Sequence, residues 1–340
     1  MLVLLISHFL FSEMLRLRET RRLPYKGRVV HVQEDGAAAV WAKSETRYYT
    51  ADGKEHAIQD QPGNVCYFAC AQNVGIVTNS TGVVNVWDLL LGKLSRTLMT
   101  GSVAEWAHVE VAISPDASLA AVYSRSHGII IFNVARGQEM CRVLTGSVHG
   151  WLVELWGNGE LAYVHQEEET LVVVDASTGM PLYSLSGHET EVRCAARGPN
   201  TLMVTGCNLN QDEYSCMVVR LWRGNSLVWR TQLNEENMRL LAVSPCGRFV
   251  AVGGAGLALL DARTGACWGT YKTQWLTASL CFFPGGVHAG FRDGEITSYD
   301  LCDPLENLVT IMGAPLNTPV GRMMARAGDG AVAVRVARMF

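Results

Sequence analysis

Charged residues are scarce for a chain of this length. Asp, Glu, Lys and Arg make up 18% of the 340 residues, whereas about 25% is usual in soluble domains. The net charge is −4, from 28 basic and 32 acidic residues, and phosphate binding requires clustered lysine and arginine. Nucleic acid is therefore not the favoured partner. The charge deficit indicates much buried sheet, a surface covered by other proteins, or both.

Long apolar runs are also lacking. Outside the N-terminal segment, no apolar stretch approaches the 18 residues of a membrane-spanning helix. Residues 1–11 are apolar like a signal-peptide core, but they lack a basic start and a small-residue cleavage site. We expect residues 1–13 to be an apolar strand or an extension, and we expect no membrane span.

Motifs for catalysis and for metal binding are missing. The chain has no Gly-rich phosphate loop, no Gly-x-Ser-x-Gly and no His-Glu-x-x-His. Its ten cysteines include no Cys-x-x-Cys pair, whereas zinc sites normally show two close pairs. Most of them lie in apolar runs, where a thiol acts as a small hydrophobe. We expect no catalytic residue, metal or cofactor, and reduced cysteines in a cytoplasmic or nuclear protein.

A motif that recurs about every 40 residues is present instead, and this period indicates one supersecondary unit copied in an array. A short apolar run ends in a polar residue just before a turn, as in Val86-Trp87-Asp88 before Gly92. The polar positions are Thr50, Asp88, Asn133, Asp175, Arg223, Asp261 and Asp300.

Each copy divides into four β-rich runs separated by Ser, Pro and Gly turns. The third copy predicts strands over 108–114, 118–124, 128–134 and 139–144, and the sixth over 240–243, 249–253, 257–262 and 267–271. Four short strands per copy are typical of a β-propeller blade.

Several motifs resemble the WD40-repeat family: Trp87-Asp88, Gly187-His188, and the turns at 114–116 and 244–247. The resemblance covers nearly the whole chain but is degenerate, since Trp-Asp occurs once and no blade shows a complete Asp–His–Ser/Thr–Trp set. It implies an all-β, WD40-like β-propeller in a single domain over 1–340. It also implies a rigid platform that binds proteins and usually lacks chemistry of its own.

The number of blades depends on the two ends of the chain. Seven units run from about Gly27 to Gly313. Further strands are predicted at 2–11, 15–23, 320–327 and 331–339. Because unpaired strand edges promote aggregation, we expect these strands to pair as an eighth blade, with a seven-bladed ring as the alternative.

Two partner-binding sites are predicted, because loops held by a rigid scaffold often carry function and Trp, Met and Arg are enriched in interfaces. The first is the entry of the inner strands: Trp106, Trp151, Arg193, Met238, Arg239 and Trp275. Its alternative is packing of the tryptophans between blades. The second is an insertion in the fifth copy, with Asp212, Glu213 and Tyr214, which an idle insertion would explain equally well.

A basic seam at the ring closure is a further hypothesis. It would comprise Arg16, Arg18, Arg21, Arg22, Arg335 and Arg338. The alternative is edge-strand charge that discourages aggregation.

The sequence thus favours a non-catalytic scaffold or adaptor in a multiprotein complex. An RNA-associated subunit that uses the basic seam is the alternative. A quinoprotein-like enzyme is less favoured; it depends on the segment 259–268, which resembles a tryptophan-docking motif of quinoprotein propellers.

Overall fold

The computed structural model describes residues 17–301, apart from 25–27, 43–44, 59–64, 80–81, 100–108, 125–126, 144–152, 158, 166–168, 212–213, 234–238 and 274–275. The chain divides into two compact units, Glu19–Tyr299 and a unit of Met1–Arg18 with Asp300–Phe340. Only residues 17, 18, 300 and 301 of the second unit are described. The single domain over 1–340 and the apolar strand or extension at 1–13 therefore stay predictions.

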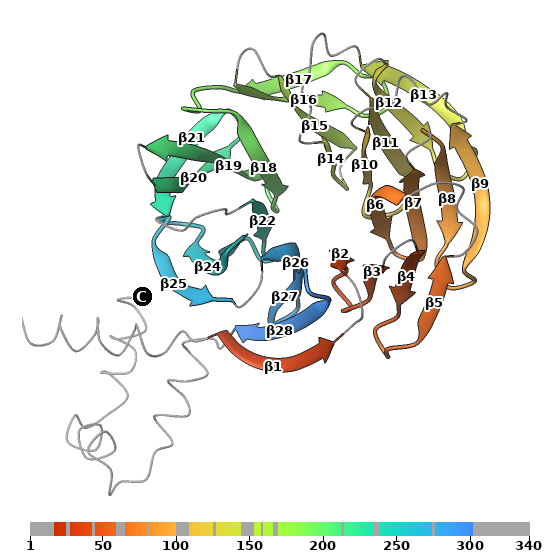
Figure 1. Ribbon diagram of the computed structural model, residues 1–340. Coiled ribbons are helices and arrows are strands. Elements are labelled where there is room, and N and C mark those ends of the chain that lie inside the picture. The colour runs from red at the N-terminus through yellow and green to blue at the C-terminus, as the bar shows by residue number, and fades with distance from the viewer. Residues whose placement is uncertain are drawn as a thin grey trace, which may run out of the picture. The chain divides into compact units, whose positions relative to one another are not determined.

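The described strands form seven four-stranded sheets, here called blades 1 to 7 (Figure 1). Blade 1 contains β2 (Arg28–Val32), β3 (Ala38–Ala42), β4 (Glu45–Tyr49) and β5 (Glu55–Ile58). Blade 2 contains β6 (Val65–Ala71), β7 (Val74–Asn79), β8 (Val84–Asp88) and β9 (Lys93–Met99). Blade 3 contains β10 (Val109–Ile113), β11 (Leu119–Ser124), β12 (Gly128–Asn133) and β13 (Gln138–Val143). Blade 4 contains β14 (Val153–Leu155), β15 (Glu160–His165), β16 (Thr170–Asp175) and β17 (Pro181–Leu185).

The remaining blades follow the same order except for the last. Blade 5 contains β18 (Val192–Arg197), β19 (Leu202–Gln211), β20 (Tyr214–Arg223) and β21 (Ser226–Leu233). Blade 6 contains β22 (Leu240–Val243), β23 (Phe249–Gly253), β24 (Gly256–Asp261) and β25 (Cys267–Lys272). Blade 7 contains β26 (Thr277–Phe283), β27 (Gly286–Phe291), β28 (Glu295–Leu301) and, beside β28, β1 (Leu17–Pro24). In the described part of the chain, no helix is long and apolar enough to cross a membrane.

The sheets are arranged as a ring, with the first strand of each blade inside and the fourth outside (Figure 1). Blade 7 contacts blade 1 and so closes the ring. In one of these contacts, the backbone N–H of Val32 donates to Ser279 Oγ at 2.9 Å. Ile296 of β28 also packs in one apolar cluster with Val32 and Val40. The unit Glu19–Tyr299 is thus a seven-bladed β-propeller, and the predicted all-β propeller class is confirmed.

The structure assigns one predicted strand to a different sheet. The strand expected at 15–23 as part of an eighth blade is β1, which pairs with β28 and supplies the outer strand of blade 7. The seven-bladed ring, our alternative, is what the described residues form. A strand exposes pairing groups along both edges, so its sequence does not indicate which sheet it joins. The other strands predicted for an eighth blade, at 2–11, 320–327 and 331–339, lie outside the described residues.

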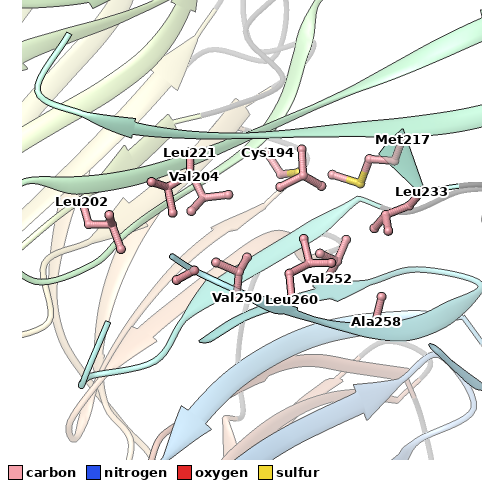
Figure 2. Packing of buried hydrophobic residues seen from close by; sticks show 12 residues of the cluster. Cys194, Leu202, Val204, Met217, Leu221, Leu233, Val250, Val252, Ala258 and Leu260 are labelled. Carbon is pink, nitrogen blue, oxygen red and sulfur yellow. The ribbon is translucent and has the colours of Figure 1, made fainter. Parts of the chain in front are cut away.

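The apolar core lies between neighbouring blades rather than in the centre of the ring. One such cluster joins blades 5 and 6, with Val204 and Met217 facing Val250 and Leu260 (Figure 2). Middle strands are buried on both faces, as β11 and β12 are, whereas the outer strand β9 is mostly exposed. Continuous Val, Ile and Leu runs therefore mark the middle strands, because both faces of these strands pack against neighbouring blades.

The recurring polar residue has a structural explanation. Asp261 Oδ1 accepts the backbone N–H groups of Arg263 and Thr264, each at 2.8 Å. Gly265 closes the same turn at φ 74°, and its missing Cβ would lie 2.8 Å from the ring of Trp229 in blade 5. A side chain at this position would therefore be strained and would also clash with the neighbouring blade. The motif accordingly fixes turns and contacts between neighbouring blades.

Candidate protein-interaction site

Exposed apolar side chains gather on one part of the outer rim. Nine large apolar side chains in the described part of the chain are exposed, and all but Tyr67 lie on outer strands of blades 2 to 5 or in the turns before them. We call them the apolar rim: Leu90, Leu91, Leu94, Met140, Met180, Leu182, Leu227 and Val228. Because each blade runs its strands in the same order, these positions lie at the end of the ring where outer strands begin.

The predicted contact face lies at the opposite end, where inner strands begin. Of its residues, the structure fully describes Arg193 and Arg239, at the entries of the neighbouring inner strands β18 and β22, and both are exposed. Arg193 pairs with Glu191 at 3.0 Å. Trp106, Trp151, Met238 and Trp275 lie outside the described residues, so the role of this face stays a prediction.

The insertion in the fifth copy is a longer hairpin and not a loop. Strands β19 and β20 stay paired from Leu202↔Arg223 to Gln211↔Tyr214. Asp212 and Glu213 lie outside the described residues, and of Tyr214 only the backbone is described, at the start of β20. The extra residues continue the antiparallel pairing as far as Gln211↔Tyr214. A binding role for these three residues stays a prediction.

Half of the basic seam can be located on the backbone. Arg18, Arg21 and Arg22 are residues of β1, the outer strand of blade 7. Arg16, Arg335 and Arg338 lie outside the described residues. Juxtaposition of the two groups, on which the seam depends, is therefore still a prediction.

A buried hydrogen-bond network links the segment before β18 to the middle strands of blade 5. The Trp222 indole N–H donates to Thr205 Oγ1 at 2.9 Å, and His188 Nε2 lies 2.9 Å from the same oxygen. His188 Nδ1 faces the carbonyl oxygen of Glu169 at 3.2 Å, so the proton of the neutral ring belongs on Nδ1 and Nε2 accepts from Thr205. Burial, aided by the charge of Arg220, lowers the pKa of His188 to about 4. These three side chains fix the loop 186–191 to the blade.

This network was not predicted from the sequence, although Gly187-His188 is one of the motifs that resemble the WD40-repeat family. Trp87 matches the family motif because Asp88 follows it, yet the Trp87 indole N–H is buried without a hydrogen-bond partner in the described structure. The strand register explains the difference. Val77, opposite Asn85 in blade 2, occupies the position that Thr205, opposite Arg220, occupies in blade 5. Blade 2 thus has valine where the acceptor would be. In blade 5, Trp222 pairs with Met203, and Thr205 follows Met203 by two residues. A threonine at this spacing is the sequence signal that would have indicated the network.

Blade 5 also holds a buried cation. Arg220 is 2% exposed and forms an ion pair with Glu189 Oε2. Glu189 Oε1 accepts from Arg230 Nε at 2.9 Å, and Arg220 Nη1 donates to Cys207 Sγ at 3.2 Å. Burial, together with the charge of Arg230, lowers the pKa of Arg220. Glu189 is therefore the counterion that keeps this guanidinium tolerable inside the blade.

The tryptophan contacts differ from the quinoprotein pattern. Trp268 lies against Phe249 of its own blade, with ring centroids 5.0 Å apart. The turn 261–265 is contacted instead by Trp229 of the preceding blade, whose indole N–H donates to the carbonyl oxygen of Ala262 at 2.9 Å. The Trp229 contact joins adjacent blades, whereas the ring contact of Trp268 lies within its own blade.

The cysteines that the structure describes are all free thiols. Four of the eight, Cys70, Cys194, Cys207 and Cys216, are buried, as the sequence predicts. Cys246 and Cys267 are exposed, which corrects the expectation of core positions, because these two lie in a turn and at the start of an outer strand. No cluster of three metal-ligating side chains occurs among residues with described positions.

Glu154 is an unusual residue of the inner strand β14. Its carboxyl group has no hydrogen bond or ion pair within the described structure, and burial raises its pKa to about 7. Glu154 pairs with Ala162 across the strands of blade 4. The residues that occupy the same register position are Ala112, opposite Ala121 in blade 3, and Ala242, opposite Ala251 in blade 6. Blade 4 thus carries an acid where other blades carry a methyl group.

Replacing Glu154 with glutamine should change the pH dependence of stability. Between pH 4.5 and about 7 the folded chain retains a proton that the unfolded chain releases, so the free energy of unfolding falls as pH rises through this window. E154Q removes that loss and should be more stable than the parent by on the order of 2 kcal/mol at pH 8, with no difference at pH 4.5. Urea denaturation at both pH values measures it.

E34Q, at an exposed turn residue, provides the control for loss of one negative charge. The buried histidines His31 and His188, whose pKa values burial lowers to about 4, act in the opposite direction but equally in both proteins. A pH-independent difference between parent and E154Q would contradict the prediction.

Comparison with known proteins places the fold but not the role. No family model and no curated protein matches the chain. Among solved structures, a chain in "Crystal Structure of Mitotic Checkpoint Complex" superposes with a TM-score of 0.68 at 15% identity, covering 85% of this chain and 93% of that one. The propeller fold is shared. Because 1488 chains match, the likeness supports the resemblance drawn from the motifs at the level of fold and singles out no function.

Proposed function

We propose that this propeller is a non-catalytic interaction scaffold, a subunit or adaptor of a multiprotein complex, in the cytoplasm or nucleus. The apolar rim is the observation that carries the proposal. Exposed apolar patches mark interaction sites in soluble proteins, and in the described part of the chain the large exposed apolar side chains lie on blades 2 to 5. Core packing between the blades holds these residues in one frame, so a partner can bind without the entropy cost of ordering the platform.

Two further observations agree with the proposal. One of the matching solved structures is of a protein complex, the mitotic checkpoint complex, which is a property of that protein and serves here as support. The eight described cysteines are free thiols, as in a reducing compartment. The proposal involves no catalytic residue, metal or cofactor.

Affinity purification of the tagged full chain from its own cells at moderate salt tests the scaffold proposal. We expect a small stoichiometric set of proteins by mass spectrometry, unchanged by nuclease. Absence of any stoichiometric protein would contradict the proposal. Loss of the partners on nuclease treatment would replace it with the RNA-associated alternative and direct attention to β1.

A further inference from the structure

The turn between β8 and β9 differs from the equivalent turns of the other blades. After Asp88 and the buried Leu89, it presents Leu90 and Leu91, which are 40% and 65% exposed. The equivalent pairs are Ala-Arg after Val134, Ser-Thr after Ala176 and Arg-Thr after Ala262. The turn itself requires only the backbone here, since Asp88 Oδ1 accepts the N–H of Leu91 at 2.9 Å. Folding therefore does not explain two exposed leucines at this place.

Leu94 extends the same apolar surface along the outer strand. It is 49% exposed, two residues into β9. Together with Leu90 and Leu91 it gives three large apolar side chains within five residues of sequence. This is the densest part of the apolar rim.

Three cations lie on the same outer strand or in the neighbouring turn of blade 3. Lys93 and Arg96 belong to β9, and Arg136 belongs to the next turn of blade 3. Arg96 Cδ lies 3.2 Å from where a Cβ of Gly137 would stand, so it lies against the turn that carries Arg136. None of the three forms an ion pair within the described structure. Asp88, which lies opposite Lys93 in the β8–β9 pair, accepts the N–H of Leu91, and Glu139 pairs with Arg142 at 3.0 Å.

We infer that this surface, called the β8–β9 corner and comprising Leu90, Leu91, Leu94, Lys93, Arg96 and Arg136, binds an acidic segment of a partner protein that also carries Leu or Phe side chains. The inference rests on the proposed scaffold function and names the partner's chemistry. The leucines supply an apolar contact, and the three cations select carboxylates and repel basic segments. A nucleic acid would leave the leucines without contacts and would find few phosphate ligands.

Peptide selection tests the inference with a defined probe. A random-peptide display library is panned against the immobilised full chain, and selected peptides are synthesised for fluorescence anisotropy. We expect enrichment of peptides that combine Asp or Glu with Leu or Phe. Their affinity should fall at least tenfold in L91S/L94S and several-fold in K93Q/R136Q, and it should weaken as salt rises. The matched control M180S/L182S alters the rim on blade 4 and should leave the affinity unchanged.

Circular dichroism and melting temperature of each variant verify folding, and the exposed positions make destabilisation small. Equal binding by L91S/L94S and the parent, or selected peptides without acidic residues, would overturn the inference. Binding of phosphatidylserine vesicles or of a single-stranded oligonucleotide to the corner, with displacement of the peptides, would also overturn it. A parent protein that is a dimer and becomes a monomer in L91S/L94S would do the same. If L91S/L94S still co-purifies the stoichiometric proteins of the parent, the scaffold function stands and the inference about the β8–β9 corner is wrong. If the parent itself co-purifies no stoichiometric protein, the proposed scaffold function is wrong.

Discussion

Replacing Glu189 with alanine should lower the free energy of unfolding by about 3 kcal/mol, because it leaves the buried guanidinium of Arg220 without its counterion. Breaking a buried pair typically costs about 3–5 kcal/mol, and we expect the lower end since the Glu189 side chain is 37% exposed. Urea denaturation of the full chain at pH 7 gives the midpoint and slope from which the loss is calculated.

A surface pair of the same composition provides the control. Arg47 and Glu55 are 2.9 Å apart, with side chains 30% and 44% exposed, and exposed pairs contribute about 0–1 kcal/mol. E55A should therefore change stability by less than 1 kcal/mol. Equal losses in E189A and E55A would show that the buried position of Arg220 has no energetic consequence.

The second large effect is expected from Thr205→Val, which keeps the side-chain shape and removes the hydroxyl. The Trp222 N–H and His188 Nε2 would both lose their partner inside the blade. An unsatisfied buried polar group costs about 1–3 kcal/mol, so T205V should lower stability by about 2–3 kcal/mol. Denaturation monitored by tryptophan fluorescence measures it.

The reciprocal substitution, Val77→Thr in blade 2, is the matched control. By register it places a hydroxyl where blade 5 has Thr205, within the blade whose Trp87 indole N–H is unpartnered. We expect V77T to be neutral or to stabilise by up to about 1 kcal/mol. A loss as large as that of T205V would mean that the hydroxyl does not reach Trp87 and that the register argument fails.

Local sequence signals predicted the blades well. Strands predicted at 240–243 and 249–253 match β22 and β23 to the residue, because turn glycines and apolar runs are local features. The partner of β1 was not predictable in the same way. Its pairing with β28 joins segments from opposite ends of the described chain, and nothing within either segment encodes that choice.

The candidate site was predicted less well than the fold. The expected contact face was chosen by residue type at the inner-strand entries, of which the structure fully describes Arg193 and Arg239. The apolar rim was not predicted because the sequence does not distinguish Leu89, which is fully buried, from Leu91, which is 65% exposed. That distinction depends on which way a tight turn presents consecutive leucines.

The pairing of β1 with β28 also constrains how the chain folds. Blades 1 to 6 are each built from one contiguous segment, so their hairpins can form in order as the chain leaves the ribosome. Blade 7 must wait for Glu295–Leu301 before Leu17–Pro24 acquires a neighbour. Loop-closure entropy is therefore concentrated in this last pairing, and we expect the sealing of the ring to be the slow stage of folding, with the unpaired edge of β28 exposed to aggregation until then.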